Sequence, residues 1–205
     1  DDEPTMEFRN INRAYDSLRI NHNDNLLSNW REGMTGIPIV DACMRCLDHT
    51  GYLNFRMRAM IVSFAAFNLW QDWKHFSHHL AKKFLDYEPG IHYSQIQMQS
   101  AVTGINTVRI YNPVKNSIDL DPRGEFIKKW LPELHNIPSE YVHQPWKMTI
   151  IEQQMYNFKI GVDYPSPIVD INLSRKEAMN KIWEIKKTAK SKTFAKKILN
   201  KHVNS

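Results

Sequence analysis

Cysteine and histidine side chains are the residues of this sequence whose types and spacing come nearest to a metal site. Cys43 and Cys46 have C-x-x-C spacing, but a tetrahedral zinc ion needs four ligands and the chain has no other cysteine. His75, His78 and His79 lie close together, yet no H-E-x-x-H pattern accompanies them and lysines flank them. We therefore predict buried structural thiols, an exposed polar histidine face and no metal site.

Arginines and acids form a second group with chemical potential. Arg56 and Arg58 stand at the start of the most apolar segment, where a cation needs a carboxylate or phosphate partner. Asp86 and Glu88 follow at the end of the next expected helix, so a helical hairpin can bring one arginine to Asp86. The spacing alone is compatible with a structural or a functional pair.

Aromatic residues form the third group. A planar cofactor or a flipped base needs aromatic walls, but large aromatic residues are more often part of the core. Composition does not separate these two roles for Trp70, Trp73, Phe76, Tyr93, Tyr111, Trp130 and Trp146.

The elements that must position these residues are helical. Apolar residues at three- and four-residue steps predict helices over residues 40–47, 56–73, 76–84, 95–101, 124–134 and 148–158. Gly51 is a stop for the first of them. Residues 103–122 contain Gly104, Pro113 and Pro122 and predict a long ordered loop, and 164–167 a rigid extended connection. A final helix is expected over 174–200, capped by Ser174. The fold class is all-α.

Length and composition limit the class of protein. The chain has 205 residues, of which 42% are hydrophobic, so it fits one ordinary folded domain. No apolar run approaches the roughly 20 residues that span a bilayer, and no signal peptide is visible. Two cysteines favour a reducing compartment, the cytoplasm or, in a eukaryote, the nucleus. The acidic opening at residues 1–3, without Met, suggests a processed chain or a piece of a longer one.

The positive charge is concentrated at the C-terminal end. The chain has 27 basic and 22 acidic residues, and residues 175–201 contribute ten basic and two acidic residues, or +8. The remainder is therefore near −3. We predict a domain over residues 1–170 and a basic helical region over 171–205. Such a region contacts nucleic-acid phosphates or, more commonly, forms a solvated lysine-rich face.

Seven segments in order resemble the photolyase and cryptochrome family. Residues 30–47 (WREGMTGIPIVDACMRCL) resemble its W-x-x-G-x-T-G-x-P-x-V-D-A-x-M-R-x-L signature, and 50–58 (TGYLNFRMR) its T-G-W-x-H-N-R-x-R. The other matches are 109–113 (RIYNP), 121–127 (DPRGEFI), 130–134 (WLPEL), 142–146 (VHQPW) and 163–169 (DYPSPIV). The resemblance implies the later part of the helical domain that binds FAD. The α/β antenna domain and the loop that holds the flavin pyrophosphate would lie before residue 1.

The resemblance also implies roles for single residues. The family's D-x-D, which meets the flavin ring, falls at Asp86-Tyr87-Glu88, and Arg58 is the partner of Asp86 in a partly buried ion pair. His92 falls where the family faces flavin N5. Trp73 matches the middle member of the electron-transfer chain. Matches to DNA-contacting positions are Phe55, Arg56, Met57 and Asn116.

Several positions depart from the family. The W-Q-W after the flavin acids is Ile96-Gln97-Met98, and no tryptophan stands near Ile20 for the outer member of the electron-transfer chain. The usual H-N-R is Asn54-Phe55-Arg56. Gln95, Gln97 and Gln99 alternate in this divergent stretch without an assigned role.

Three functions follow from these residues. The first is light-driven electron donation from FAD to a lesion in DNA. The second is a flavin-based light sensor that acts through conformational change, and the third is a flavin-free helical module that binds nucleic acid. With the pyrophosphate loop missing, we expect this chain to hold FAD poorly unless an upstream segment or a separate chain completes the site.

Overall fold

The structure is a computed structural model that describes residues 4–202, and the acidic opening at residues 1–3 lies outside this range. The described chain is all-α, as predicted, with no strand and one isolated bridge between Ile160 and Tyr164. The helices are α1 (Asp24–Arg31), α2 (Pro38–Thr50), α3 (Phe55–Ser63), α4 (Lys74–Lys83), α5 (Pro89–Gln99), α6 (Pro113–Leu120), α7 (Glu125–Trp130), α8 (Ser139–Val142), α9 (Ile150–Met155), α10 (Ile171–Lys187) and α11 (Ala189–His202). Short turns are η1 (Pro4–Glu7), η2 (Arg13–Tyr15), the π-helical η3 (Phe64–Asn68), η4 (Pro132–Leu134) and η5 (Pro145–Lys147).

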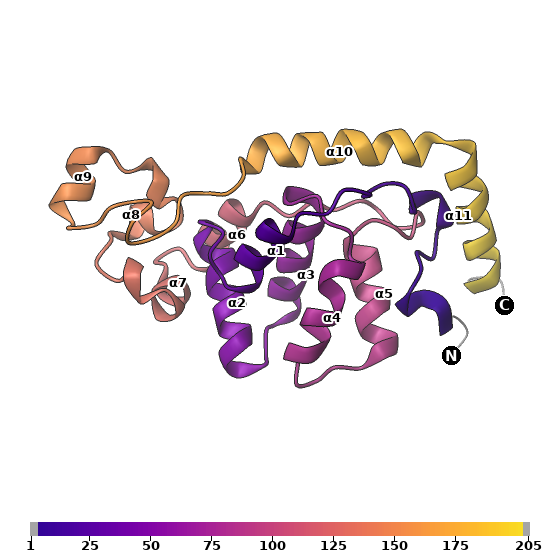
Figure 1. Cartoon of the computed structure of the whole chain (residues 1–205), viewed down its shortest axis with the longest axis horizontal. Coiled ribbons are helices and arrows are strands. Elements are labelled where there is room, and N and C mark those ends of the chain that lie inside the picture. The colour runs from indigo at the N-terminus through magenta and orange to yellow at the C-terminus, as the bar shows by residue number, and fades with distance from the viewer. Residues whose placement is uncertain (1–3, 203–205) are drawn as a thin grey trace.

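The helices α2 to α5 form the centre of the molecule (Figure 1). α3 packs against α2, η3 and α5, and α4 also contacts α5. α7, α8 and α9 extend from one end, where α7 packs on α2. From that end α10 runs back along one long side over η3, and α11 turns down beside the N-terminal turn η2. The first and last described elements therefore lie at the same end of the molecule.

Two predicted helices are confirmed, and a third is found in two pieces. The helix expected over residues 40–47 is α2, which ends at Gly51 with φ of 67°, a left-handed conformation that glycine adopts without steric cost. Residues 76–84 fall in α4, and residues 124–134 form α7 and η4 with a break at Leu131. Local periodicity and stop signals were sufficient in these segments because nothing outside them changes the path of the chain.

The single helix expected over residues 56–73 is wrong in its second half. α3 ends at Ser63, the π-helical turn follows to Asn68, and Trp70 has φ of 54°. Buried polar side chains explain the break. Asn68 Nδ2 donates to Ser174 Oγ at 3.0 Å, and Gln71 Oε1 accepts a backbone N–H from the segment before α1. These bonds join segments that are distant in sequence.

Prolines in the middle of the chain start helices where the sequence analysis expected breaks or loops. Pro113 occupies the first turn of α6, so the loop expected over 103–122 is wrong there; Asn112 caps this helix. α5 begins at Pro89, well before the expected residue 95, and Glu88 caps it. Proline is well suited to the first helical position, where its missing N–H and fixed φ cost nothing.

The C-terminal helix expected over 174–200 is two helices. Asp170, not Ser174, caps α10, since its carboxylate accepts from the N–H groups of Asn172 and Leu173. Thr188, with ψ of 147°, interrupts the helix, and its hydroxyl accepts from Ser191 N. α1 was not anticipated at all, although Asn23 is a good capping residue for it.

A buried carboxylate joins the start of α2 to the segment before α10. Asp41 is fully buried and accepts hydrogen bonds from Thr35 N, Thr35 Oγ1, Gly36 N and the Tyr164 hydroxyl. Gly36 has φ of 75°, and a Cβ there would lie 2.4 Å from Ser166 O. Burial raises the pKa of Asp41 and its hydrogen bonds lower it, and the larger effect of burial leaves the pKa at about 6.

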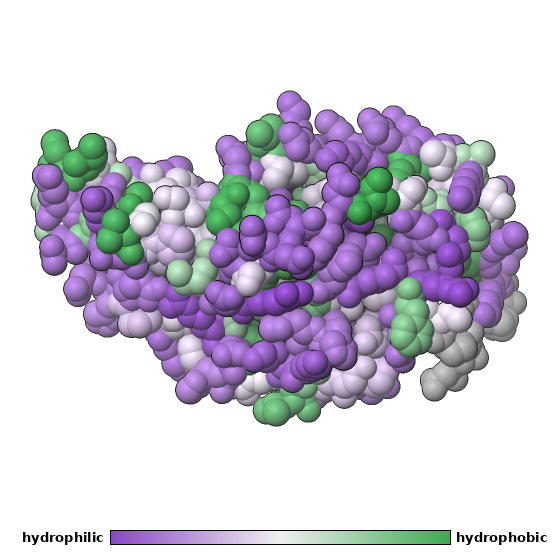
Figure 2. All heavy atoms as spheres, in the orientation of Figure 1, coloured by the Kyte–Doolittle hydropathy of each residue, from purple (hydrophilic) through white to green (hydrophobic). Residues whose placement is uncertain are grey.

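Hydrophobic side chains are exposed at the end of the molecule that α9 occupies (Figure 2). None of the α9 residues is buried, and Ile150, Ile151 and Met155 are each at least 70% exposed. In the part of the chain that is described, every helix is too short or too polar to cross a lipid bilayer.

We expect Asp41→Ala to lower the free energy of unfolding by about 3 kcal/mol or more, because it leaves four buried donors without this acceptor. Urea denaturation measures this loss. Asp119→Ala removes an exposed carboxylate and is the control, with an expected change below about 0.5 kcal/mol. Equal stability of the two variants would contradict the role of Asp41.

Candidate functional site

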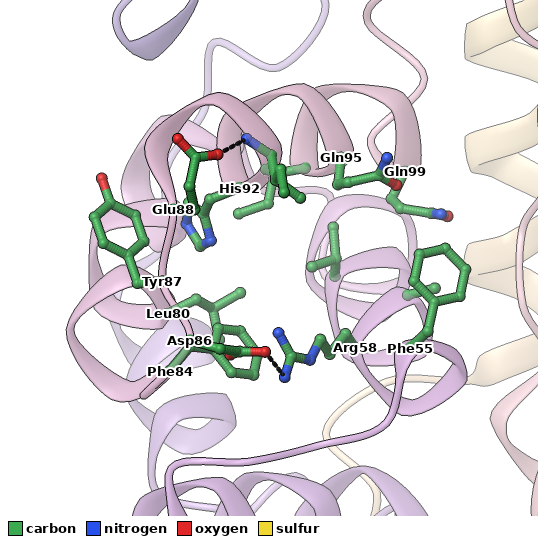
Figure 3. Close-up of a pocket in the computed structure, with 14 residues that line it drawn as sticks. Phe55, Arg58, Leu80, Phe84, Asp86, Tyr87, Glu88, His92, Gln95 and Gln99 are labelled. Atoms are coloured by element: carbon green, nitrogen blue, oxygen red, sulfur yellow. Dashed lines mark hydrogen bonds and ion pairs between the residues drawn. The ribbon is translucent and has the colours of Figure 1, made fainter.

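An open cavity of about 200 Å³ lies between α3, α4, α5 and the loop that joins α4 to α5. Its wall is largely apolar, with charged and polar groups at the rim. The residues that line it are Phe55, Arg58, Ala59, Val62, Leu80, Phe84, Asp86, Tyr87, Glu88, Ile91, His92, Gln95, Ile96 and Gln99. All five residues that the sequence analysis assigned to cofactor binding are therefore brought together. Figure 3 shows Arg58 and Asp86 on one side of the opening, with His92, Gln95 and Gln99 on the helix opposite.

The ion pair between Arg58 and Asp86 is confirmed, with 2.8 Å between Nη2 and Oδ2. Three contacts hold the guanidinium: Nε donates to Leu53 O at 2.7 Å, the carboxylate binds Nη2, and the group lies 4.2 Å from the centre of the Phe84 ring. The hydrogen bond from Arg58 lowers the pKa of Asp86. The Asp86 side chain is 56% exposed, so the pair is more open than the sequence analysis expected.

Glu88 and His92 are fixed by the first turns of α5. Glu88 Oε2 accepts from Ile91 N at 2.7 Å, so the carboxylate caps the helix at the rim of the cavity. His92 Nε2 lies 2.9 Å from Ser77 O, and a carbonyl only accepts, so Nε2 carries a proton. Burial lowers the pKa of His92, and the neutral ring therefore offers Nδ1 as an acceptor. The ring of Tyr87 packs edge-on against it at 5.2 Å.

Two glutamines of the divergent stretch line the cavity, which the sequence analysis did not foresee. Gln95 Oε1 is buried and has no hydrogen-bond partner among the described residues, and Gln99 lies one turn further on. Gln97 faces the other way and is fully buried: its Nε2 donates to Met6 O and Arg9 O, and its Oε1 accepts from Ile11 N. The i, i+3, i+7 spacing of His92, Gln95 and Gln99 was the signal available for a shared face.

Trp73 does not line this cavity. It is 1% exposed, its Nε1 donates to Asn10 Oδ1 at 2.7 Å, and its ring meets Tyr93 edge-on with 6.2 Å between centroids. Ile96, which stands in the family's tryptophan pattern, supplies part of the cavity wall. The Tyr93 ring also meets His92, which lines the cavity, edge-on with 5.1 Å between centroids.

The four residues assigned to DNA divide between two hollows. Arg56, Met57 and Asn116 line a second, smaller hollow of about 90 Å³, where Asn116 Nδ2 is buried without a hydrogen-bond partner. Phe55 is 63% exposed and lies instead at the mouth of the first cavity. Since Phe55 and Arg56 are consecutive residues of α3, the two hollows open on either side of the start of that helix.

The cysteines and histidines form no metal site in the described part of the chain. No group of three His, Cys, Asp or Glu residues within residues 4–202 is placed to hold a metal ion, and both cysteines are free and buried. His75 and His78 are exposed, as expected. His79 is half-buried beside the Trp30 ring, and burial together with Arg31 lowers its pKa to about 4.

Comparisons with known proteins place this site in a family. The family model described as the FAD binding domain of DNA photolyase matches residues 1–184. A deoxyribodipyrimidine photo-lyase of Alkalihalophilus pseudofirmus is 37% identical over 87% of this chain and 38% of its own length. Cryptochrome-1 of Drosophila melanogaster is 35% identical over 77% of this chain and 30% of its own.

A solved structure supports the same assignment. A bacterial class III photolyase from Agrobacterium tumefaciens superposes with a TM-score of 0.83 at 28% identity, over 90% of this chain and 39% of that chain. The chain therefore belongs to the photolyase and cryptochrome family and forms part of its FAD-binding domain, whose cofactor is FAD. It spans less than two fifths of the length of these relatives.

The residues of the cavity fit part of this cofactor. Pockets that enclose a drug-sized ligand measure about 300–1,000 Å³, and the 200 Å³ found here is suited to a fused ring system rather than a whole dinucleotide. The unpartnered carbonyl of Gln95 needs a donor, and Arg58 and Asp86 offer a cation and an acceptor at the rim. These are the groups that a ring with N–H and carbonyl edges would use.

We expect Asp86→Asn to change the free energy of unfolding by only about 0.2–1 kcal/mol, since exposed ion pairs contribute this much. In a complex completed by the preceding part of a relative's domain, the same substitution should weaken FAD binding at least about tenfold, because the cavity loses its charged acceptor. Asp48→Asn breaks the exposed Lys83 pair outside the cavity and is the matched control. Urea denaturation and flavin fluorescence measure the two effects, and equal FAD affinity in both variants would contradict the assignment.

The lowered pKa of His79 predicts a pH dependence of stability. The folded value of about 4 lies below the unfolded value near 6.5, so the stabilisation is complete above pH 6.5 and is lost as the pH falls to 4. His79→Gln should flatten this part of the stability curve, whereas His78→Gln, at an exposed site, should keep the parent's slope. Asp41 acts in the opposite direction but is common to all three proteins. Parallel curves for His79→Gln and the parent would refute the prediction.

Proposed function

We propose that the cavity between α3 and α5 binds the ring system of FAD. The observation that carries this proposal is the Arg58–Asp86 pair, which faces the unpartnered carbonyl of Gln95 across the opening (Figure 3). Asp86 accepts a hydrogen bond from a ring N–H, and Arg58 places a positive charge beside the ring. When bound, FAD supplies light-driven electron transfer. The neutral His92 offers an acceptor on the α5 wall and holds no proton on Nδ1.

We further propose that the domain acts on DNA, as a lyase that repairs a pyrimidine lesion. The second hollow supports this proposal, because the unpartnered Asn116 amide can donate to a base or sugar and Arg56 lies exposed at the same site. Phe55 at the mouth of the first cavity offers an aromatic face to an extruded base. Free, buried cysteines agree with a reducing compartment, the cytoplasm or nucleus.

A light sensor is the second candidate. The α5 wall of the cavity has Ile96 where the family has tryptophan, and Trp73 does not line the cavity. Both features interrupt the usual route by which electrons reach the cofactor, and repair requires a reduced flavin. Family membership favours either flavoprotein over a flavin-free nucleic-acid module. Blue-light repair of an oligonucleotide that carries a cyclobutane dimer or a 6-4 photoproduct separates the enzyme from the sensor.

We expect the 205-residue chain alone to bind FAD no tighter than about millimolar. The cavity holds only the ring side of the cofactor, and each missing charge-assisted bond to the pyrophosphate costs about 1.5–3 kcal/mol. Three such losses weaken a submicromolar site to this level, since each 1.4 kcal/mol is about tenfold. Adding the preceding part of a relative's domain, fused or as a separate chain, should restore a yellow complex, as flavin absorbance after gel filtration would show.

The control for this experiment is the same preceding segment added to Asp86→Asn. If the ring side is placed correctly, the variant complex should hold less FAD than the parent complex. Micromolar binding by the chain alone would contradict the proposal of an incomplete site, and unchanged loading of the variant complex would contradict the proposed ring position.

A further inference from the structure

The C-terminal end of the chain carries a positive surface that the FAD-binding domain does not account for. The family match ends at residue 184. From residue 185 to 202 the chain has seven lysines and no acid, so this segment is basic without any internal compensation. Most of it is α11, which Figure 1 shows beside the N-terminal segment, away from α7 to α9.

α11 is a folded element and not a loose basic tail. Asn12 Nδ2 donates to Ser191 O at 3.2 Å, and Ser191 Oγ donates to the Tyr15 hydroxyl at 3.4 Å, both in buried positions. Ile198 is 9% exposed, and Phe194 packs against the core. One side of the helix is therefore fixed to the residues around η2, and the lysines lie on its exposed side.

Five exposed lysines at this end of the chain take part in none of the ion pairs that the described residues 4–202 show. Those ion pairs join other residues. The exposed lysines without a partner carboxylate are Lys187, Lys190, Lys192, Lys196 and Lys197. The 14 residues of α11 span about 21 Å, and the lysines recur along that length. Unpaired cations held at this density repel one another, which an anionic partner would relieve.

We propose that the last turn of α10 and the outer side of α11 bind the phosphate backbone of double-stranded DNA, without sequence preference. Duplex DNA carries one charge per roughly 1.7 Å, so a 21 Å helix lies beside more phosphates than it has lysines. Lysine binds phosphate as a point charge and does not read bases with fixed geometry. Trp183 is 47% exposed, and Lys186 Nζ lies 5.4 Å from its ring centre. Trp183 by itself does not form the row of aromatic residues on which unstacked bases would stack.

Two other anionic partners fit this surface less well. A membrane-binding helix inserts a free apolar face, whereas the apolar side of α11 is turned inward through Phe194 and Ile198. An acidic protein partner needs an apolar anchor, and lysines are the most frequent exposed residues of α11, with Leu199, at 42%, the one large apolar side chain exposed among its described residues. Of the three anionic partners, DNA therefore fits this surface best, because its recognition needs only complementary charge.

The test uses an undamaged duplex in the dark, so that neither FAD nor lesion recognition is required. Fluorescence anisotropy of the full chain with a labelled duplex should show binding that weakens about 100-fold between 50 and 200 mM salt, for about four phosphate contacts. The triple variant Lys190→Gln, Lys192→Gln and Lys196→Gln should reduce the slope of log K against log salt by about 3.

Matched variants show whether DNA binding depends on the lysines of this surface or only on the net charge of the protein. Lys129→Gln, Lys147→Gln and Lys159→Gln remove the same charge from exposed sites elsewhere and should leave the slope unchanged. The three tail lysines replaced by arginine should keep the parent's affinity, which excludes a folding defect as the cause. The proposal is overturned if both triple glutamine variants lose binding equally, if neither does, or if anionic phosphatidylserine vesicles bind more tightly than DNA.

Discussion

A buried carboxylate at the start of α2 fixes the position of the segment before α10. Asp41 accepts a hydrogen bond from the Tyr164 hydroxyl, 123 positions further along the chain, while it also holds the turn at Thr35 and Gly36. The neighbouring bond from Ile168 N to Thr35 O keeps the extended segment parallel to this turn. The chain then enters α10 in one direction, over η3. Because a buried carboxylate without its donors is costly, a path that removed Tyr164 from Asp41 would lose this stabilisation.

The cavity depends on interactions that are mostly local to its rim. Arg58 is held by a backbone carbonyl, an aromatic ring and Asp86, so its charge stays in one place without a ligand. Glu88 caps α5, and the same helix then directs His92 and Gln95 to the opposite wall. The site is therefore largely preorganised on one side. The groups that this side presents are those proposed to recognise the ring of the cofactor.

The two surfaces that are proposed to contact DNA are separate from one another. The hollow at Asn116 opens beside α3, whereas the lysines of α11 lie at the end of the molecule where η2 and the N-terminal segment pack. A surface without base contacts cannot select a lesion, but it can hold the protein near the duplex that contains one. Binding of this kind would raise the rate of encounter and leave the choice of site to the cavity side.

The all-α class, α2 with its stop at Gly51, and the charge of the C-terminal end are all local properties, and the sequence alone determined them. Motif resemblance also identified Arg58 and Asp86 as partners. The tertiary structure decided where the chain departs from local rules. The π-helical turn at Asn68 is bonded to the distant Ser174, and α11, which follows the break at Thr188, is held by bonds between Ser191 and the distant Asn12 and Tyr15. The tertiary structure also decided the exposure of Asp86 and the unpartnered carbonyl of Gln95, since both depend on which helices surround them. Periodicity and capping act over a few residues, whereas burial and partner choice are set by the packing of the whole domain.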